Sequence, residues 1–132
     1  MTLPHTAYAT AMHAALAAEG LPPSVTEVSV TESLIAGIQL TTRDLSMTFT
    51  WHGGVRMVWQ LAWGWRLDRP DRVGLEEVSL PLMVAPAALV PHVRAALDGM
   101  SGADVADKPA LWEHYHVLDR QIADWESRPD SV

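Results

Sequence analysis

The chain has 132 residues, of which 48% are hydrophobic and 19% charged, a balance typical of one globular domain and not of a disordered segment. Its formal net charge of −7 opposes binding to nucleic acid or an anionic membrane, and the absence of cysteine excludes disulfides and thiolate catalysis. The N-terminus lacks the basic start and apolar core of a signal peptide, and no apolar run approaches the ~20 residues of a membrane span, so we expect a cytoplasmic protein.

The first predicted element is a helix that begins near Pro4 and Thr6 and ends at Gly20. Gly20 suits the left-handed residue that closes a helix, and Leu21 suits the hydrophobic contact that accompanies such an end. The residues that form one apolar face, at spacings i, i+4, i+7 and i+8, are Tyr8, Met12, Ala15 and Leu16.

From residue 25 onward the apolar period changes to two, which predicts antiparallel strands. Val28 and Val30 mark a first strand, and Ile38 and Leu40 mark a second. The polar stretch 42–44 predicts a bend before the next strand.

The strongest alternation runs from residue 47 to residue 67, with bulky apolar side chains at odd positions. A three-residue loop at 52–54 pairs Trp51 with Val55 and keeps this set on one face, whereas a two-residue loop would split it, so we predict the three-residue hairpin. Alternation does not decide whether the chain then runs straight or turns again near 62–64, since pairing Trp59 with Trp65 also preserves the face. The odd-position residues are Met47, Phe49, Trp51, Val55, Met57, Trp59, Leu61, Trp63, Trp65 and Leu67.

The stretch 78–82 predicts a last strand at a sheet edge, because Pro81 within it cannot donate to a ladder. A helix follows and ends at Gly99. Its start is open, since Pro86 and Pro91 are both acceptable in a first turn. Its predicted buried stripe is Leu89 or Val90, Val93 and Leu97.

Residues 101–106 predict a linker to a final helix over 107–128, in which Asp107 suits the cap and Pro109 the first turn. This helix carries a two-heptad apolar seam, which is too short for an independent coiled coil and must be covered by the sheet of this chain or of another subunit. The seam consists of Leu111, Tyr115, Leu118, Ile122 and Trp125.

Together these elements predict a single α+β domain over residues 1–132, with a core over 1–100. An N-terminal helix leads into a four- to five-stranded antiparallel meander, and two C-terminal helices pack on one sheet face.

Residues 3–100 also carry a family resemblance. The run 3–8, leading into an Ala-rich helix that ends at 20–22, resembles the opening of a small actinobacterial (Streptomyces-type) family of unknown function. Trp59 followed by the run 64–66, and the later run 84–86, match that family's Trp, Gly-Trp-Arg and Val-x-Pro motifs at its spacing. The resemblance covers residues 3–100 and implies no activity, substrate or catalytic residue. It implies that 60–63 form a hairpin turn that is charged in the family, so the apolar turn here would be an exposed contact surface. The element order also resembles the fold of bacterial secretion chaperones, at the level of fold alone.

No sequence pattern indicates catalysis, a metal or a cofactor. Four of the six histidines stand on separate predicted elements, without the spacing of a metal motif. His114 and His116 share a predicted helix but, at ~100° per residue, point roughly 200° apart. We therefore predict solvated or capping histidines, and we interpret Glu76 and Glu77 as a solvated bend.

The candidate functional surfaces are the aromatic sheet face and the C-terminal seam. The simplest interpretation of the tryptophans is a hydrophobic core, and the alternatives are a pocket for a small ligand or an anchor for a protein partner. We expect a non-catalytic protein-interaction or chaperone-like module that forms a homodimer or binds another protein. The alternative is a small-molecule-binding or cyclase-like enzyme whose cavity is lined by Met57, Trp59, Trp63 and Tyr115. The candidate residues are Trp51, Met57, Trp59, Leu61, Trp63, Trp65, Leu111, Tyr115, Leu118, Ile122 and Trp125.

Overall fold

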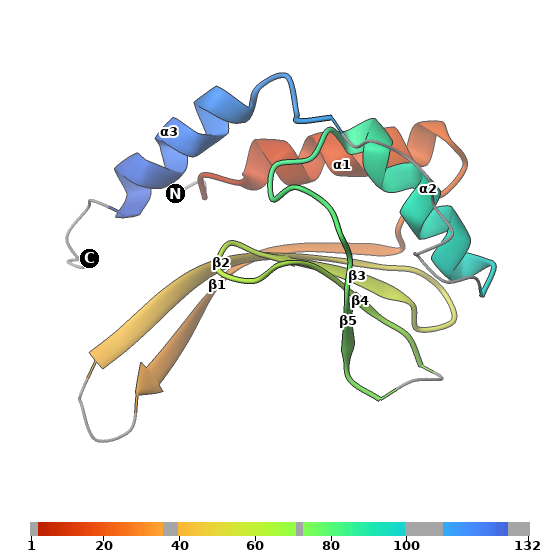
Figure 1. The fold of residues 1–132 in the computed structure, drawn as a ribbon, viewed down its shortest axis with the longest axis horizontal. Helices are drawn as coiled ribbons and strands as arrows, with labels where there is room; N and C mark the ends of the chain where they lie inside the picture. The colour runs from red at the N-terminus through yellow and green to blue at the C-terminus, as the bar shows by residue number, and fades with distance from the viewer. Residues whose placement is uncertain (1–2, 36–39, 71–72, 100–109, 127–132) are drawn as a thin grey trace.

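The protein folds as one antiparallel sheet with all of its described helices on one side (Figure 1). The structure is a computed structural model that describes residues 3–35, 40–70, 73–99 and 110–126, with the backbone alone for 31–35 and 40–43. The five strands lie in chain order, so the sheet is a meander, and the predicted α+β class is confirmed. The elements are α1 (Thr6–Ala18), β1 (Val25–Ile35), β2 (Leu40–Thr50), β3 (Arg56–Gln60), β4 (Gly64–Asp68), β5 (Leu75–Glu77), α2 (Pro86–Leu97) and α3 (Tyr115–Glu126).

Helix α1 follows the predicted pattern from its buried face to its end. Tyr8, Met12 and Leu16 are fully buried, as their spacing predicts. Gly20 adopts a left-handed φ of 77°, and the Leu21 N–H donates to the Leu16 carbonyl at 2.9 Å. This is the hydrogen bond of a helix end closed by a left-handed glycine, and Leu21 packs against the core beyond it.

Strands β1 and β2 pair without interruption from Val25 opposite Thr50 to Ile35 opposite Leu40. The predicted bend at 42–44 is therefore wrong, because β2 is extended throughout. Polar composition suggested a turn, but β1 supplies a backbone partner for every residue of this stretch, and threonine is readily accommodated in strands. Ile38 lies outside the described residues.

Both hairpins in the aromatic stretch keep its register. The Trp51 N–H donates to the Val55 carbonyl at 2.9 Å across a loop in which Gly54 has a φ of 89°, which confirms the three-residue hairpin. The second turn also forms, since Trp59 stands opposite Trp65. The chain therefore turns again after β3 and does not run straight to Leu67.

The last strand lies earlier in the sequence than its apolar alternation indicated. Strand β5 comprises Leu75–Glu77, so Glu76 and Glu77 occupy a strand and not a bend. The Val78 N–H still donates to the Trp65 carbonyl at 3.0 Å, but the chain then leaves the sheet toward the helices. The residues at 78, 80 and 82 pack partly buried against the core from this connection, where an extended path gives the same period of two as a strand.

Helix α2 begins at Pro86, with Pro91 in its interior. Leu89, Val90 and Val93 are buried, and Gly99 has a φ of 78° just after the helix. Pro86 therefore fills the first-turn position, which settles the start that the sequence left open.

Helix α3 begins at Tyr115, so the prediction of a helix from residue 107 is wrong for the described residues before it. Leu111 instead forms an isolated bridge with Val84, flanked by hydrogen bonds of 2.8 Å from the Ala85 N–H to the Ala110 carbonyl and from the Trp112 N–H to the Met83 carbonyl. Backbone used in this bridge is not available for a helical turn. Residues 101–109 and 127–128 lie outside the described residues.

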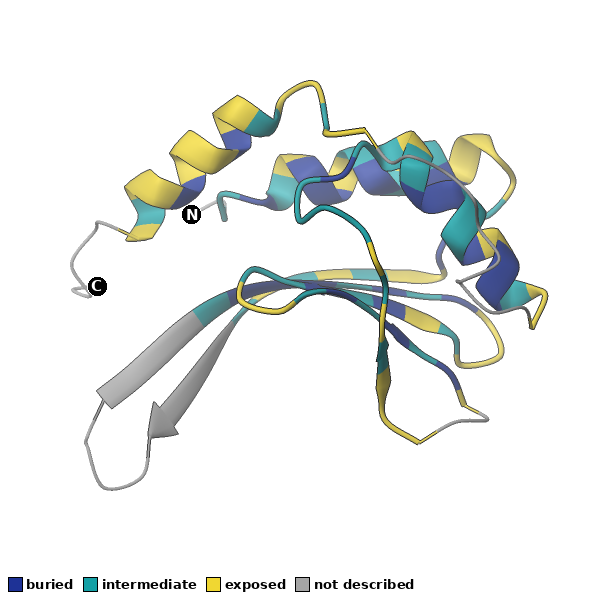
Figure 2. Ribbon diagram, viewed as in Figure 1, coloured by how far each residue is buried: buried dark blue, intermediate teal, exposed yellow. Residues whose placement is uncertain are grey.

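The core is the layer between the sheet and the helices (Figure 2). The helices direct their buried residues toward the sheet and leave their outer surfaces exposed. The largest fully buried side chains are Trp59, Trp65, Tyr8, Phe49, Met12, Leu16, Leu45, Met47, Met57, Leu89, Leu118 and His5.

Candidate functional site

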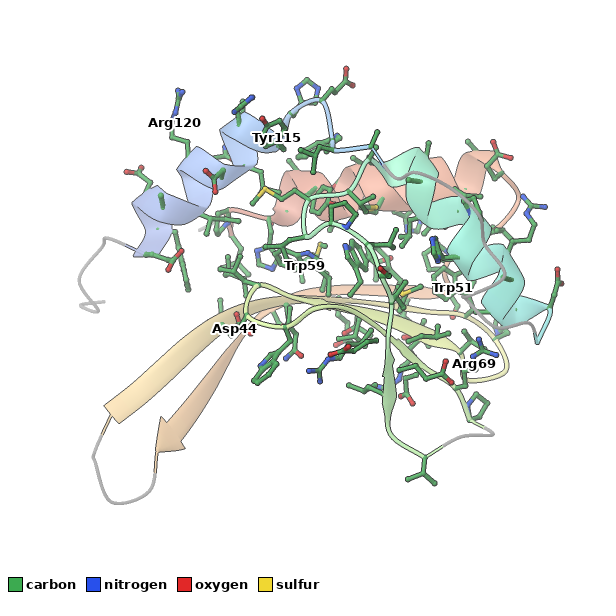
Figure 3. The ribbon with its side chains drawn as sticks, in the orientation of Figure 1. Asp44, Trp51, Trp59, Arg69, Tyr115 and Arg120 are labelled. Atoms are coloured by element: carbon green, nitrogen blue, oxygen red, sulfur yellow. The ribbon has the colours of Figure 1, made fainter. Side chains whose placement is uncertain are left out.

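Three tryptophans of the predicted aromatic face are core residues. Trp51, Trp59 and Trp65 are 6%, 0% and 2% exposed, and Figure 3 shows Trp51 and Trp59 between the sheet and the helices. The indole N–H of Trp51 donates to the Leu21 carbonyl at 2.9 Å, and that of Trp59 donates to the Leu82 carbonyl at 2.8 Å. These bonds satisfy buried donors and attach the sheet to the segments that lead to and from the helices.

Trp63 differs from the other sheet tryptophans because it lies in the turn between β3 and β4 and is 65% exposed. The prediction that it shares the buried face is wrong, since strict alternation ends where Gln60 pairs with Gly64 and the chain reverses. The guanidinium carbon of Arg66 stands 5.1 Å from the centre of the Trp63 ring, within the range of a cation–π contact. This contact holds a large aromatic ring in place on the surface.

The same turn forms one wall of a pocket of about 360 Å³ between the sheet and α3. The Ala62 N–H donates to the Asp44 carboxylate at 3.2 Å, which fixes the turn against β2. Three carboxylates and no basic group line the pocket, and Arg120 on α3 points away from the sheet (Figure 3). The lining residues are Asp44, Leu61, Ala62, Leu82, Met83, Asp119, Ile122, Ala123 and Glu126.

The C-terminal seam is covered by this chain, although not along its whole length. Leu118 and Ile122 are buried in the core cluster, and Trp125 packs against that cluster while partly exposed. Tyr115 is partly buried at the start of α3, whereas Leu111 is 50% exposed in the bridge before it. The seam therefore packs α3 against the hydrophobic core of its own chain.

The four residues proposed to line an enzyme cavity do not come together. Met57 and Trp59 are fully buried in the packed core, Trp63 is exposed in the turn, and Tyr115 lies on α3. A separate groove of about 640 Å³ lies between α1 and α2. Small apolar side chains form most of its lining, which also includes Arg94 and Glu19, an ion pair of 3.8 Å.

His5 is the histidine whose environment departs furthest from the prediction of solvated or capping residues. It is fully buried, its Nε2 lies 2.9 Å from the Ser46 carbonyl oxygen, and its ring stacks on Trp59 with centroids 5.7 Å apart. It occupies the N-cap position of α1, but its side chain makes no capping bond. Burial lowers the pKa of His5, partly offset by its backbone hydrogen bonds and by the charge of Asp44.

Tyr8 is a further buried titratable group that the fold holds in place. The Tyr8 hydroxyl donates to the Val84 carbonyl at 2.6 Å, and burial raises the pKa of Tyr8. Within the described residues no group of three or more His, Asp or Glu side chains is placed to hold a metal ion. His5 and Tyr8 both bond to backbone carbonyls of distant segments, so both contribute to structure.

The class of protein is defined by its fold and its surface. The fold is a five-stranded antiparallel meander covered on one face by helices, and the surface carries an exposed aromatic turn beside an acidic pocket. The chain matches no family model, no curated protein and no solved structure. The resemblance to an actinobacterial family thus stays a prediction. In the part of the chain that the structure describes, no helix is long and apolar enough to cross a membrane. The cytoplasmic location stays a prediction from the sequence.

The pocket includes residues that sequence reasoning did not select. Asp44 was part of the predicted bend, Met83 had no role, and Asp119 and Glu126 are single acids on a helix surface. No local sequence signal brings them together, because their proximity depends on how α3 lies on the sheet. The apolar turn at 60–63, by contrast, was identified from the family resemblance.

Proposed function

We propose that this protein is a non-catalytic protein-interaction module, chaperone-like in fold, that binds a partner polypeptide through the β3–β4 turn and the pocket beside it. The observation that carries this proposal is the exposure of Trp63. A tryptophan that is 65% exposed on an apolar turn keeps a large hydrophobic surface in water unless a partner covers it.

The turn is suited to binding because its geometry is already fixed. Arg66 stacks on the Trp63 ring, the Ala62 N–H is bonded to Asp44, and Gly64 adopts a left-handed φ of 79° after the loop. A rigid aromatic anchor loses little conformational entropy on association, and tryptophan is enriched among the residues that dominate binding energy.

The pocket indicates the chemistry of the partner. Its apolar lining includes Leu61, Leu82 and Ile122, and its charged lining is acidic, from Asp44, Asp119 and Glu126. A partner segment with an apolar side chain next to lysine or arginine complements both features and the net charge of −7. A second copy of the chain is a further proposed partner, and it would use a different surface, the free edge of β1.

Affinity capture from the source cells tests the turn. The bait is the full chain, and the comparison is Trp63→Ala against the matched control Val73→Ala, since Val73 is also an exposed apolar residue but lies in a different turn, between β4 and β5. We expect proteins that are captured by the wild type and by Val73→Ala to be lost with Trp63→Ala, while the thermal unfolding of all three baits stays the same. Equal capture by all three baits contradicts the proposal.

A further inference from the structure

The two edges of the sheet are built differently. Strand β5 has only three residues and carries two adjacent glutamates, and both features discourage pairing with another strand. Strand β1 has 11 residues in uninterrupted register with β2. Its sequence contains no proline, lysine or arginine, and no strand pairs with its outer edge among the described residues (Figure 1).

The hydrogen bonds of β2 show which groups of β1 face outward. The Trp51 N–H donates to the Val55 carbonyl and the Leu61 N–H to the Leu45 carbonyl, so odd-numbered residues of β2 bond toward β3. Because residues of an antiparallel strand alternate between its two neighbours, even-numbered residues of β2 bond toward β1. Their partners are the odd-numbered residues of β1. The even-numbered residues of β1, Val28 and Val30 among them, therefore direct their N–H and C=O groups outward.

We propose that β1 pairs antiparallel with β1 of a second copy of this chain, which joins two sheets across a two-fold axis. A second copy is the occupant that closes the assembly, since one symmetric contact uses the open edge of both chains and leaves only the short β5 edges exposed. Pairing between β1 and the β5 edge would instead continue without end, and the two glutamates of β5 oppose it.

The alternation of free groups also sets the geometry of the pair. Residues whose backbone N–H and C=O groups point outward must stand opposite residues of the same kind in the second copy, so even positions pair with even positions. The helices of both copies then lie on the same side of the joined sheet. In the register where Val28 stands opposite Val30 of the second copy, Glu27 faces Thr31 and Glu32 faces Thr26. No glutamate then stands opposite another, and the half-buried valines at the core edge of β1 cover one another.

Sedimentation equilibrium of the full chain tests the pairing. We expect the wild type to have twice the 14.5 kDa mass of one chain. Val30→Pro removes an outward N–H that no described residue of the same chain accepts, and it should return the mass to that of one chain. Val30→Thr, which keeps the N–H and the branched side chain, should remain a dimer. A wild-type mass of one chain across the micromolar range overturns the proposal.

A single cysteine tests the register without relying on the proline variant to fold. In the proposed register Ser29 stands opposite itself as a non-hydrogen-bonded pair, for which the ~4.5 Å spacing of Cα atoms lies within the range of a disulfide. The chain has no cysteine of its own. Ser29→Cys should therefore oxidise to a disulfide-linked dimer, whereas Ser79→Cys, exposed beyond β5, should stay largely reduced. Equal cross-linking of the two variants, or a dimer that Val30→Pro leaves intact, overturns the proposal.

The two proposals fail separately. Trp63→Ala should leave the dimer mass unchanged, because the β3–β4 turn is not part of the β1 edge. Loss of the dimer in Val30→Pro would in turn say nothing against capture through Trp63.

Discussion

The burial of His5 should make the stability of this protein depend on pH in a defined window. Its Nε2 is bonded to a backbone carbonyl and therefore carries the proton of the neutral ring, while its buried Nδ1 has no hydrogen-bond partner among the described residues. Protonation would place a charge and an unpaired N–H in the core, against Trp59. The pKa of His5 is accordingly lowered by burial from its ordinary value of 6.5.

The sign and size of the effect follow from proton linkage. Above the ordinary pKa both folded and unfolded chains hold a neutral ring, so this group contributes no pH dependence. As the pH falls below 6.5, the unfolded chain binds a proton that the folded chain does not, and the free energy of unfolding decreases. The decrease stops once the pH reaches the lowered pKa of the folded state. One such group can remove at most about 1.4 kcal/mol between about pH 7.5 and about pH 5.5.

Urea unfolding, followed by the fluorescence of the buried tryptophans, measures this loss. The comparison is His5→Gln, whose amide nitrogen can still donate to the Ser46 carbonyl but does not titrate. The carboxylates and the other five histidines are common to both proteins, so their contribution cancels in the difference. We expect the wild type to lose up to about 1.4 kcal/mol more than the variant on acidification through this window. Parallel pH profiles for the two proteins would refute the reasoning.

Three further substitutions test contacts elsewhere in the fold, each by urea or thermal unfolding. Tyr8→Phe removes the buried bond to the Val84 carbonyl and should cost about 1–3 kcal/mol; no change would mean that water replaces the hydroxyl. Gly54→Ala places a side chain at a φ of 89° and 3.4 Å from a proline ring, and should cost about 1–2 kcal/mol, so a neutral result would contradict the hairpin geometry. Leu118→Ala should cost about 2–5 kcal/mol and Val117→Ala less than about 0.5 kcal/mol, because only the first is buried; equal losses would show that α3 does not pack as described.

The hairpin registers could be predicted from sequence because two constraints act on the same residues. The period of two assigns side chains to faces, and the loop length must keep the apolar face together. Trp51 opposite Val55 satisfies both constraints, whereas a shift of one residue would bury Arg56. The end of α1 at Gly20 was predictable for a similar reason, since a left-handed glycine and the apolar residue after it give one local signal.

The errors occurred where the structure of a segment depends on a distant one. The stretch 42–44 is a strand because β1 extends far enough to pair with it. Leu111 was assigned to a helix by its heptad position, but its backbone neighbours pair with the segment around Val84, 27 positions earlier in the sequence. Local periodicity carries no information about such partners, and the acidic pocket was missed for the same reason.

The structure changes the expectation of which surfaces are available to a partner, because it shows which apolar faces pack against each other. From the sequence, the aromatic sheet face and the C-terminal seam were two separate candidate surfaces for a partner. In the structure Trp59 lies under the helices, and Leu118 and Ile122 pack into the same cluster, so each surface covers the other. If the apolar face of each element is considered separately, every buried contact is counted twice. Each face is then expected to need a binding partner, although the other face of the same chain already covers it. Trp63 remains 65% exposed although Arg66 lies over its ring, and no described strand pairs with the outer edge of β1, so the two proposals rest on these two features.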